Sequence, residues 1–187
     1  VTFKFANGEP ALIQMQQRSP TFSPEFTDRA LAAELLSLTV ADLADTPVQE
    51  VSCGVPFLFI PVKSLAAVQK IKFRMDVWER SLSQYGQMFA FTTETLNPTS
   101  TVHSRMFAPA MGIPEGPATG AASGPLGCYL VQYGIVQANP SHIISEQGFE
   151  LGRPSYIHIE IHQAAGAYTF VGVGGECVYM GEGSLEV

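Results

Sequence analysis

A run of small residues inside one predicted helix is the feature that most constrains how this chain can fold. Residues 119–133 read as a helix, and its first half consists largely of glycine, alanine, serine and cysteine. A sheet can enclose such a helix closely, because no large side chains hold the two apart. Pro125 leaves two alternatives open, since proline inside a helix removes a hydrogen bond and clashes with the preceding turn. The helix either starts at Thr119 and bends, or starts near Ser123.

Strand-like segments predominate around this helix, which predicts an α+β fold with a mixed sheet wrapped around it. Asn7-Gly8 is a turn signal between the first two strands, and Asn97-Pro98 separates a second hairpin. Residues 19–24 are rich in Pro, Ser and Thr and predict an extended connector, which we take as the domain boundary, with residues 1–26 before it and residues 27–187 as the main domain. The predicted strands cover residues 2–5, 11–17, 48–52, 56–62, 88–93, 101–107, 142–146, 156–162, 168–173 and 176–180, and shorter helices follow the caps Thr27 and Ser64 and span residues 75–85.

Charge and composition exclude several classes of partner. The chain of 187 residues has a net charge of −7 with scattered basic residues, which argues against nucleic acid and anionic membranes. Its apolar runs are too short to span a bilayer. Three widely spaced cysteines suit neither a disulfide framework nor a zinc motif, and we expect a cytoplasmic location. Because Val1 already reads as part of a strand, we expect that the chain begins within a fold.

The loop before the small-residue helix is the strongest functional signal. It runs from Arg105 through Glu115-Gly116-Pro117-Ala118-Thr119-Gly120-Ala121 to Gly127. Amides at a helix start have no partner within the helix and can hold a carboxylate or another anion. The alternative is a tight strand-to-helix turn in which glycines serve only steric needs. No lysine follows the last glycine, so the pattern is not a phosphate-binding P-loop.

This stretch resembles the signature of the phenazine biosynthesis isomerase (PhzF-like) family, in which a Glu-Asp-Pro-Ala-Thr-Gly-Ser-Ala-like loop opens a central helix. Residues 51–58, Val-Ser-Cys-Gly-Val-Pro-Phe-Leu, and Gly152-Arg153-Pro154-Ser155 with residues 171–175 resemble two further parts of that family. The resemblance implies a diaminopimelate epimerase-like fold of two similar domains that face each other across the active site. Residues 1–26 are then a remnant of the first domain, and residues 27–187 are the second.

The resemblance also implies a cofactor-independent isomerase that shifts a proton on a small carboxylic acid. It assigns substrate binding to Cys53, Gly54, Gly116, Thr119, Gly120 and Ala121, and implies neither a metal nor a cofactor. Two positions depart from the family loop: Gly116 stands where the family has Asp, and Ala121 stands where it has Ser. The family's principal proton-transferring Glu lies in segments that this chain does not contain. Glu115 is the weak candidate for its replacement, and we expect the chain alone to be inactive.

Other polar groups are weaker candidates. His158, Glu160 and His162 alternate with isoleucines, so they share one face of a strand; a metal site there competes with a simple solvated face, which we favour. Cys53 and Cys128 are either reactive thiols or packing residues, and packing is favoured. Residues 172–175 lead into a strand and not a helix, which argues against a dinucleotide site.

A second class of function remains open beside the isomerase. The chain can be a non-catalytic carboxylate-binding or protein-interaction module derived from the same family, which Gly116 and Ala121 favour. We also expect a homo-oligomer such as a dimer, because the first two strands carry Phe3, Phe5, Leu12 and Ile13 without the rest of their sheet.

Overall fold

A single mixed sheet organises the chain in the computed structural model, which describes residues 1–6, 9–176 and 180–184. Its strands are β1 (Thr2–Ala6), β2 (Glu9–Gln16), β3 (Thr21–Phe26), β4 (Val48–Ser52), β5 (Pro56–Pro61), β6 (Met88–Thr92), β7 (Val102–Ala108), β8 (Ile113–Gly116), β9 (Ser141–Gln147), β10 (Ser155–Ala164) and β11 (Ala167–Gly175). They lie in the order β1-β2-β11-β10-β9-β7-β6-β5-β4-β3, and β8 pairs with β7. Only the pairs β5 with β6 and β7 with β9 are parallel among these strands. The prediction of an α+β fold is confirmed.

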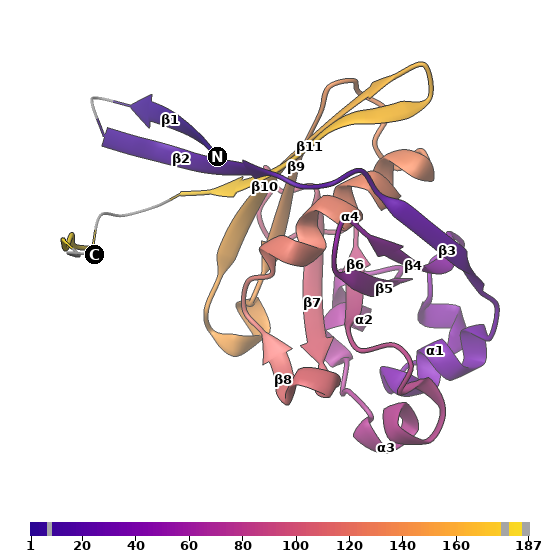
Figure 1. Cartoon of the computed structure of the whole chain (residues 1–187). Coiled ribbons are helices and arrows are strands. Elements are labelled where there is room, and N and C mark those ends of the chain that lie inside the picture. The colour runs from indigo at the N-terminus through magenta and orange to yellow at the C-terminus, as the bar shows by residue number, and fades with distance from the viewer. Residues whose placement is uncertain (7–8, 177–179, 185–187) are drawn as a thin grey trace.

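The long helix α4 (Gly120–Gln132) lies along the inner face of the curved sheet (Figure 1). It contacts β4, β5, β9, β10 and β11, and its residues from Ala122 to Leu130 are buried. A Cβ atom added at Gly127 would meet Ile159 at 2.6 Å, and one added at Gly124 would meet the Gln17 side chain. Small residues are therefore required where the sheet approaches the helix, as the sequence predicts. The helix begins at Gly120 and continues through Pro125, which decides between the two predicted starts in favour of the earlier one.

A second apolar core lies on the opposite face of the sheet. There α1 (Arg29–Leu35), α2 (Leu65–Lys70) and α3 (Met75–Val77) pack against Leu58, Ile60, Met88, Ala90 and Phe107 of the central strands. Because alternate residues of β5 and β6 point to opposite faces, Phe57, Phe59 and Phe89 instead face α4. The short helical turns η1 (Val40–Asp42), η2 (Trp78–Leu82), η3 (Pro109–Met111) and η4 (Phe149–Leu151) complete the described elements.

The β1–β2 hairpin extends away from the rest of the molecule (Figure 1). It joins the sheet through the end of β2, where Gln14, Met15 and Gln16 pair with β11. Phe3 and Phe5 on β1 are 52% and 66% exposed. The predicted hairpin is confirmed, whereas its Asn7-Gly8 turn lies outside the described residues.

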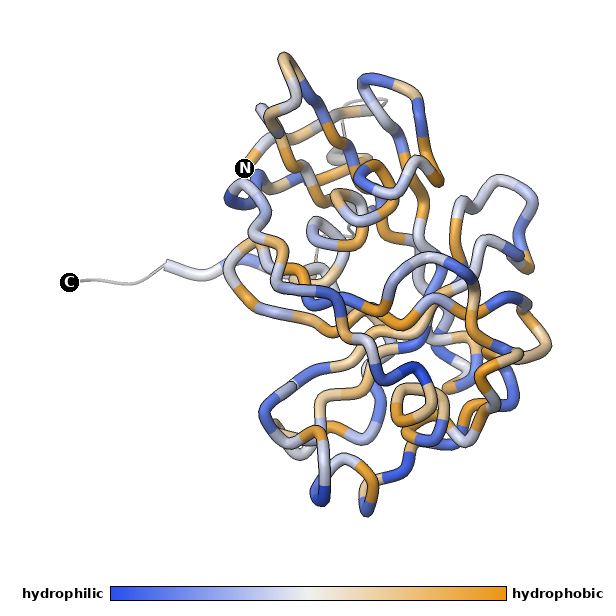
Figure 2. The backbone as a smooth tube through the Cα atoms, turned by 90° about the vertical axis from the view of Figure 1, so that its right-hand side faces the viewer, coloured by the Kyte–Doolittle hydropathy of each residue, from blue (hydrophilic) through white to orange (hydrophobic). Residues whose placement is uncertain are grey.

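Figure 2 shows the hydropathy of the residues along the chain. The central strands β5 and β6 are buried on both faces, whereas β10 alternates between buried and partly exposed residues. In β10 the isoleucines Ile157, Ile159 and Ile161 are buried, while His158, Glu160 and His162 are half-buried. The predicted sharing of one face by these three polar side chains is therefore confirmed. Within the described residues, no group of three or more His, Cys, Asp or Glu side chains has an arrangement that could hold a metal ion.

Several predicted elements need correction. Residues 19–24 were expected to form a connector without regular structure, but residues 21–24 belong to strand β3, which pairs with β4. Pro24 is accommodated because the register shifts between Phe22 and Glu25. Helix α1 is capped by Asp28 and not by Thr27, since the Asp28 carboxylate accepts the Leu31 amide at 2.9 Å. The helix predicted over residues 75–85 ends at Leu82 in a π-helical turn.

The strand predicted at residues 176–180 is wrong for Glu176 and Met180, which are not in strands, and residues 177–179 lie outside the described part of the chain. The proposed boundary between residues 1–26 and residues 27–187 stays a prediction. No helix among the described residues is long and apolar enough to cross a membrane.

Candidate functional site

The start of α4 exposes backbone amides that have no acceptor within the helix. Thr119 occupies the N-cap, and its carbonyl accepts the Ala122 amide at 3.1 Å and the Ser123 hydroxyl at 2.9 Å. The amides of Gly120 and Ala121 come before the first intrahelical hydrogen bonds, and both residues are exposed. The partial positive charge of a helix N-terminus adds to these donors. This position therefore suits an anion.

A groove of about 500 Å³ opens at this helix start. Three segments that are distant in sequence form its walls: residues 15–18 at the end of β2, Cys53-Gly54-Val55 between β4 and β5, and Gly120-Ala121 at the start of α4. Gln17 joins the first wall to the helix, because its side-chain amide donates to the Gly120 carbonyl at 2.8 Å. Arg18 is exposed and brings a positive charge to the same groove.

Gln147, at the end of β9, fixes the loop that leads into α4. It is fully buried, and its side-chain nitrogen donates to the Gly116 carbonyl at 2.7 Å and to the Thr119 hydroxyl oxygen at 3.0 Å. The next residue, Gly148, has φ +84°, and a Cβ atom there would meet the Pro117 and Arg153 carbonyl oxygens at 2.5 and 2.3 Å. One turn of backbone thus lies directly against the loop at residues 116–119 and holds it in place.

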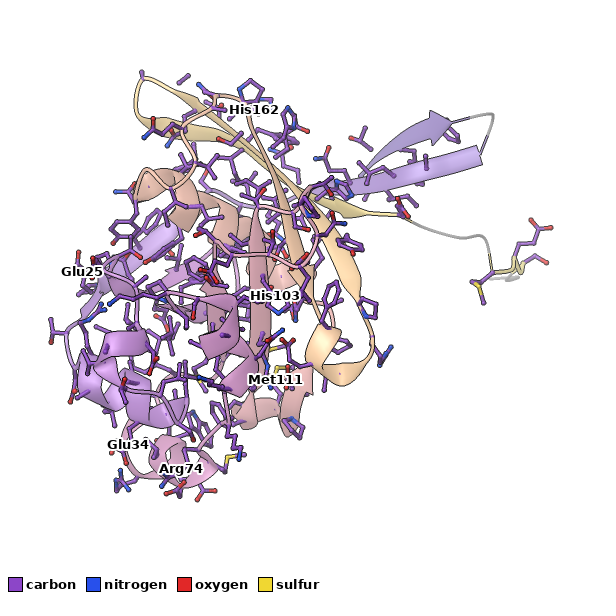
Figure 3. The ribbon with its side chains drawn as sticks, turned by 180° about the vertical axis from the view of Figure 1, so that it is seen from behind. Glu25, Glu34, Arg74, His103, Met111 and His162 are labelled. Carbon is purple, nitrogen blue, oxygen red and sulfur yellow. The ribbon has the colours of Figure 1, made fainter. Side chains whose placement is uncertain are left out.

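Behind Gln147, a buried histidine lies between two carboxylates. Nδ1 of His103 is 2.8 Å from Glu146, and Nε2 is 2.9 Å from Glu150. His103 on β7 and Glu146 on β9 are register partners in the parallel pair, which brings their side chains together. Glu146 also accepts the amides of Leu96 and Asn97. Figure 3 shows His103 within the body of the molecule, well away from His162 at the far end of β10.

These contacts shift the pKa values of all three groups. Burial by itself would lower the pKa of His103, but hydrogen bonds from the ring to Glu150 and Glu146 outweigh it and raise the pKa above its ordinary value. Burial would raise the pKa of Glu146 and Glu150, but hydrogen bonds, including those with His103, lower both below the usual range. These shifts favour the charged form of each group, an imidazolium between two carboxylates.

The predicted binding residues separate into two layers. Cys53, Gly54, Gly120 and Ala121 line the groove together. Gly116 and Thr119 are buried behind them and are held by Gln147. A side chain at Gly116 would meet the terminal methyl of Met106, which is the flexible end of that side chain. The structure thus brings the six predicted residues to one end of α4.

Glu115 has a different environment from these six residues. Its carboxylate accepts two hydrogen bonds from Arg105, at 2.8 and 2.7 Å, and Arg105 also donates to the carbonyls of Val68 and Ile71. A guanidinium that donates to both oxygens of a carboxylate fixes the position of that side chain. This geometry favours a structural ion pair, and a proton-transferring role for Glu115 stays a prediction.

Three residues of the site have no signal in the sequence that identified them. Gln17 is the last residue of a predicted strand and Arg18 follows it, and neither belongs to a motif that indicates a binding site. Gln147 is a glutamine at the end of a strand, and its role depends on a loop distant in sequence. A buried amide of this kind is identified only when its partner is known.

The chain is similar to known proteins over nearly its whole length. The model of a family described as phenazine biosynthesis-like protein (PhzC-PhzF) matches residues 4–183. The uncharacterized isomerase YfhB of Bacillus subtilis is 35% identical over 171 residues, which are 89% of this chain and 57% of that protein. Trans-2,3-dihydro-3-hydroxyanthranilate isomerase of Pseudomonas fluorescens is 31% identical over 96% of this chain and 60% of that protein.

A solved structure agrees with these matches. The Bacillus anthracis phenazine biosynthesis protein of the PhzF family superposes with a TM-score of 0.82 at 25% identity, over 97% of this chain and 62% of that one. The fold predicted from the resemblance, a mixed sheet around a central helix, is thereby confirmed. This chain spans about half the length of the curated relatives that it matches, from 43% to 60% of each.

Proposed function

The chain belongs to the phenazine biosynthesis-like protein family, and on this premise we propose that it forms the carboxylate-binding half of the active-site cleft of a cofactor-independent isomerase. The isomerase would shift a proton on a small carboxylic acid. The observation that carries the proposal is the groove in which the exposed amides of Gly120 and Ala121 meet Cys53, Gly54 and Arg18.

The helix start would bind the carboxylate of the substrate. Its amides are fixed before any ligand arrives, because Gln147 and Gly148 hold the preceding loop. Preorganised donors of this kind lose little entropy on binding and stabilise charge that develops during a reaction. The Arg18 guanidinium lies on the rim, where its charge would attract an anion to the groove.

The proton would be moved by a group from the remaining part of the cleft. The groove-lining residues of the described chain include no carboxylate and no imidazole. Losing a positioned acid or base lowers a rate by about 10²–10⁴-fold. We therefore expect this chain alone to convert dihydro-hydroxyanthranilate-like substrates at a rate near background, and turnover clearly above it would contradict the proposed division of labour.

The carboxylate site can be tested with one pair of variants. Ala121→Glu places a negative charge at the helix start, where it stabilises the helix but repels a bound carboxylate. We expect calorimetry to show benzoate binding to the wild-type chain and none to this variant, with an unchanged or raised melting temperature. Ala121→Gln is the neutral control of similar size, and benzamide is the neutral analogue of the ligand. Equal binding of benzoate and benzamide would show that the site does not recognise a carboxylate.

A second function is a non-catalytic module that retained carboxylate binding and lost the chemistry. Two observations favour it: Gly116 provides no side chain, and the neighbouring Glu115 is engaged by Arg105. The discriminating experiment joins this chain, in one polypeptide, to a domain that supplies the other half of the proposed cleft. Deuterium incorporation from the solvent into a carboxylic acid substrate is then followed. Incorporation supports the isomerase, and binding without exchange supports the module.

We further propose self-association through the β1–β2 hairpin. Phe3, Phe5 and Met15 are each at least half exposed on it, and apolar surfaces on strand edges favour pairing with another chain. Light scattering should show dimers or larger species of the 187-residue chain. A Phe3→Ser, Phe5→Ser variant should be monomeric, and a wild-type monomer at high concentration would contradict the proposal.

A further inference from the structure

Two cysteines that lie far apart in the sequence meet at the edge of the groove. Cys53 follows β4 directly, and Cys128 is in the middle of α4. Both belong to the apolar core that surrounds α4, and their thiols form a hydrogen bond with each other. Both cysteines are free thiols. The fold thus places two thiols close together beside a candidate binding site.

The two thiols differ in access. Cys128 is fully buried, and its backbone carbonyl accepts the Tyr168 hydroxyl at 3.0 Å. Cys53 is 8% exposed and lines the groove. A small reagent that enters the groove therefore meets Cys53, whereas Cys128 has no exposed surface.

The hydrogen bond between them reinforces this difference. It lowers the pKa of Cys53 in spite of burial, because the Cys128 thiol stabilises the Cys53 thiolate. The same hydrogen bond, together with burial, raises the pKa of Cys128. Thiolates and not thiols react with oxidants, so Cys53 is the nucleophile of the pair.

We propose that Cys53 and Cys128 are a peroxide-oxidisable dithiol whose disulfide weakens carboxylate binding in the groove, an inference that rests in its second half on the proposed function. The Cys53 thiolate attacks one oxygen of hydrogen peroxide, the O–O bond breaks, and the leaving hydroxide takes a proton to become water. The resulting Cys53 sulfenic acid is attacked by the Cys128 sulfur, and a second water leaves as the S–S bond forms. Both thiol protons end in the two waters, and the two electrons pass to the peroxide.

Closing the disulfide would change the shape of the groove. The S–S bond of about 2.05 Å is shorter than a hydrogen-bonded contact between sulfurs, so Cys53 moves toward α4. The adjacent Gly54, with φ +133° and no atom near its Cβ position, leaves the loop room to follow. Cys53 and Gly54 both line the groove. The wall opposite Gly120 and Ala121 thereby shifts, and the space left for the ligand changes.

Peptide mapping tests the chemical half of the proposal. The third cysteine, Cys177, is first replaced by serine, because trypsin leaves it with Cys128 in residues 106–187, while Cys53 falls in residues 30–63. After treatment with hydrogen peroxide we expect these two peptides to be joined and to separate on reduction with dithiothreitol. In Cys128→Ala the reaction should stop at the Cys53 sulfenic acid, which dimedone traps. Peroxide treatment that leaves the two peptides unlinked would overturn the dithiol.

Benzoate binding tests the regulatory half in the same Cys177→Ser background. We expect oxidation to weaken binding by about 5-fold or more, the lower end of usual coupling between two sites, and dithiothreitol to restore it. Reversal by dithiothreitol separates this effect from methionine oxidation, which a thiol of this kind does not reverse. A disulfide that leaves benzoate affinity unchanged would overturn the regulation. If the reduced chain binds no benzoate, the carboxylate site and the regulation both fail, and the linked peptides alone decide whether the dithiol exists.

Discussion

The two sides of the groove at the start of α4 are held in very different ways. The clamped side consists of the loop at residues 116–119 and the end of β9 at residues 146–148, and it is buried and densely hydrogen-bonded. The open side consists of residues 16–18 and 53–55, and Gln17 joins it to the start of the helix through a side-chain hydrogen bond. The ligand-binding amides are thus preorganised from one side, while the opposite wall keeps room to move.

This contrast predicts where substitutions will act. On the clamped side, a changed side chain leaves buried polar groups without partners, and the fold loses stability. On the open side, a change should alter binding with little effect on folding, because the residues are exposed or lie on a short loop. Substitutions on each side test whether stability and binding separate in this way.

The largest effect is expected at His103. Removing one member of a buried charged network costs about 3–5 kcal/mol, because the remaining charges lose their compensation. We expect His103→Gln to lower the free energy of unfolding by about this amount in urea denaturation. A loss below about 1 kcal/mol would show that the cluster is replaceable by neutral packing.

The same cluster should give the wild-type chain a distinct pH dependence. The pKa of His103 is raised, so its contribution is present below the ordinary histidine pKa of about 6.5 and is lost as pH rises through the raised value. The pKa values of Glu146 and Glu150 are lowered, so their contribution is present above about 4.3 and is lost as pH falls. The stability from the cluster is therefore greatest between about pH 4.3 and 6.5. Its decrease toward alkaline pH should disappear in His103→Gln.

The next effect is expected at Gly148, on the same clamped side. Gly148→Ala forces a Cβ atom against two carbonyl oxygens and places a non-glycine residue at positive φ. Together these should cost about 2–4 kcal/mol. Gly152→Ala is the matched control, because Gly152 has φ +65° but no atom within 4 Å of its Cβ position, and it should cost only about 1–2 kcal/mol. Equal losses in the two variants would mean that the close approach at Gly148 contributes nothing.

The sequence predicts the central helix and its enclosure but not this clamp. Small residues such as Gly124 and Gly127 determine how near a sheet can approach, and that limit is local to the helix. The pairing of His103 with Glu146 depends instead on β7 and β9 becoming parallel neighbours, which no local pattern specifies. The sequence does not predict strand β3 for a related reason, because a Pro-containing edge strand is recognised only through its partner.

The predicted site residues show the same difference between local sequence signals and contacts that are distant in sequence. Thr119, Gly120 and Ala121 belong to a contiguous motif whose chemistry is that of a helix start, so their location could be inferred from the sequence. Cys53 and Gly54 are predicted only through the family resemblance, and the structure places them in the groove. Gln147 was missed because its two hydrogen bonds reach a loop that is distant in sequence.

A smaller effect is expected at Gln147, where stability and binding can be separated. Gln147→Leu leaves the Gly116 carbonyl and the Thr119 hydroxyl without their donor, which should cost about 1–3 kcal/mol and weaken benzoate binding. Gln49→Leu is the control, since Gln49 is also buried and donates to the Ser23 carbonyl away from the groove. Both variants should lose stability, but only Gln147→Leu should lose affinity under conditions where the protein is folded. Equal affinities would show that the clamp stabilises the fold without positioning the helix start.

The smallest effect on stability is expected at Arg18, on the open side. There a substitution should change ligand binding more than it changes the stability of the fold. Arg18 is exposed, so Arg18→Gln should change the free energy of unfolding by less than about 0.5 kcal/mol. An exposed ion pair contributes about 0.2–1 kcal/mol, so the loss of this charge should weaken benzoate binding by up to about fivefold. Since the groove is open to solvent, this difference from the wild type should shrink as salt is added.

Titrations of benzoate at low and high ionic strength measure this difference directly. Arg74→Gln is the charge-matched control, because Arg74 is distant from the groove and paired with Asp76. A salt-independent loss of affinity would mean that Arg18 acts through packing on the groove wall, and an unfolding free energy reduced as much as in Gln147→Leu would remove the distinction between the two sides.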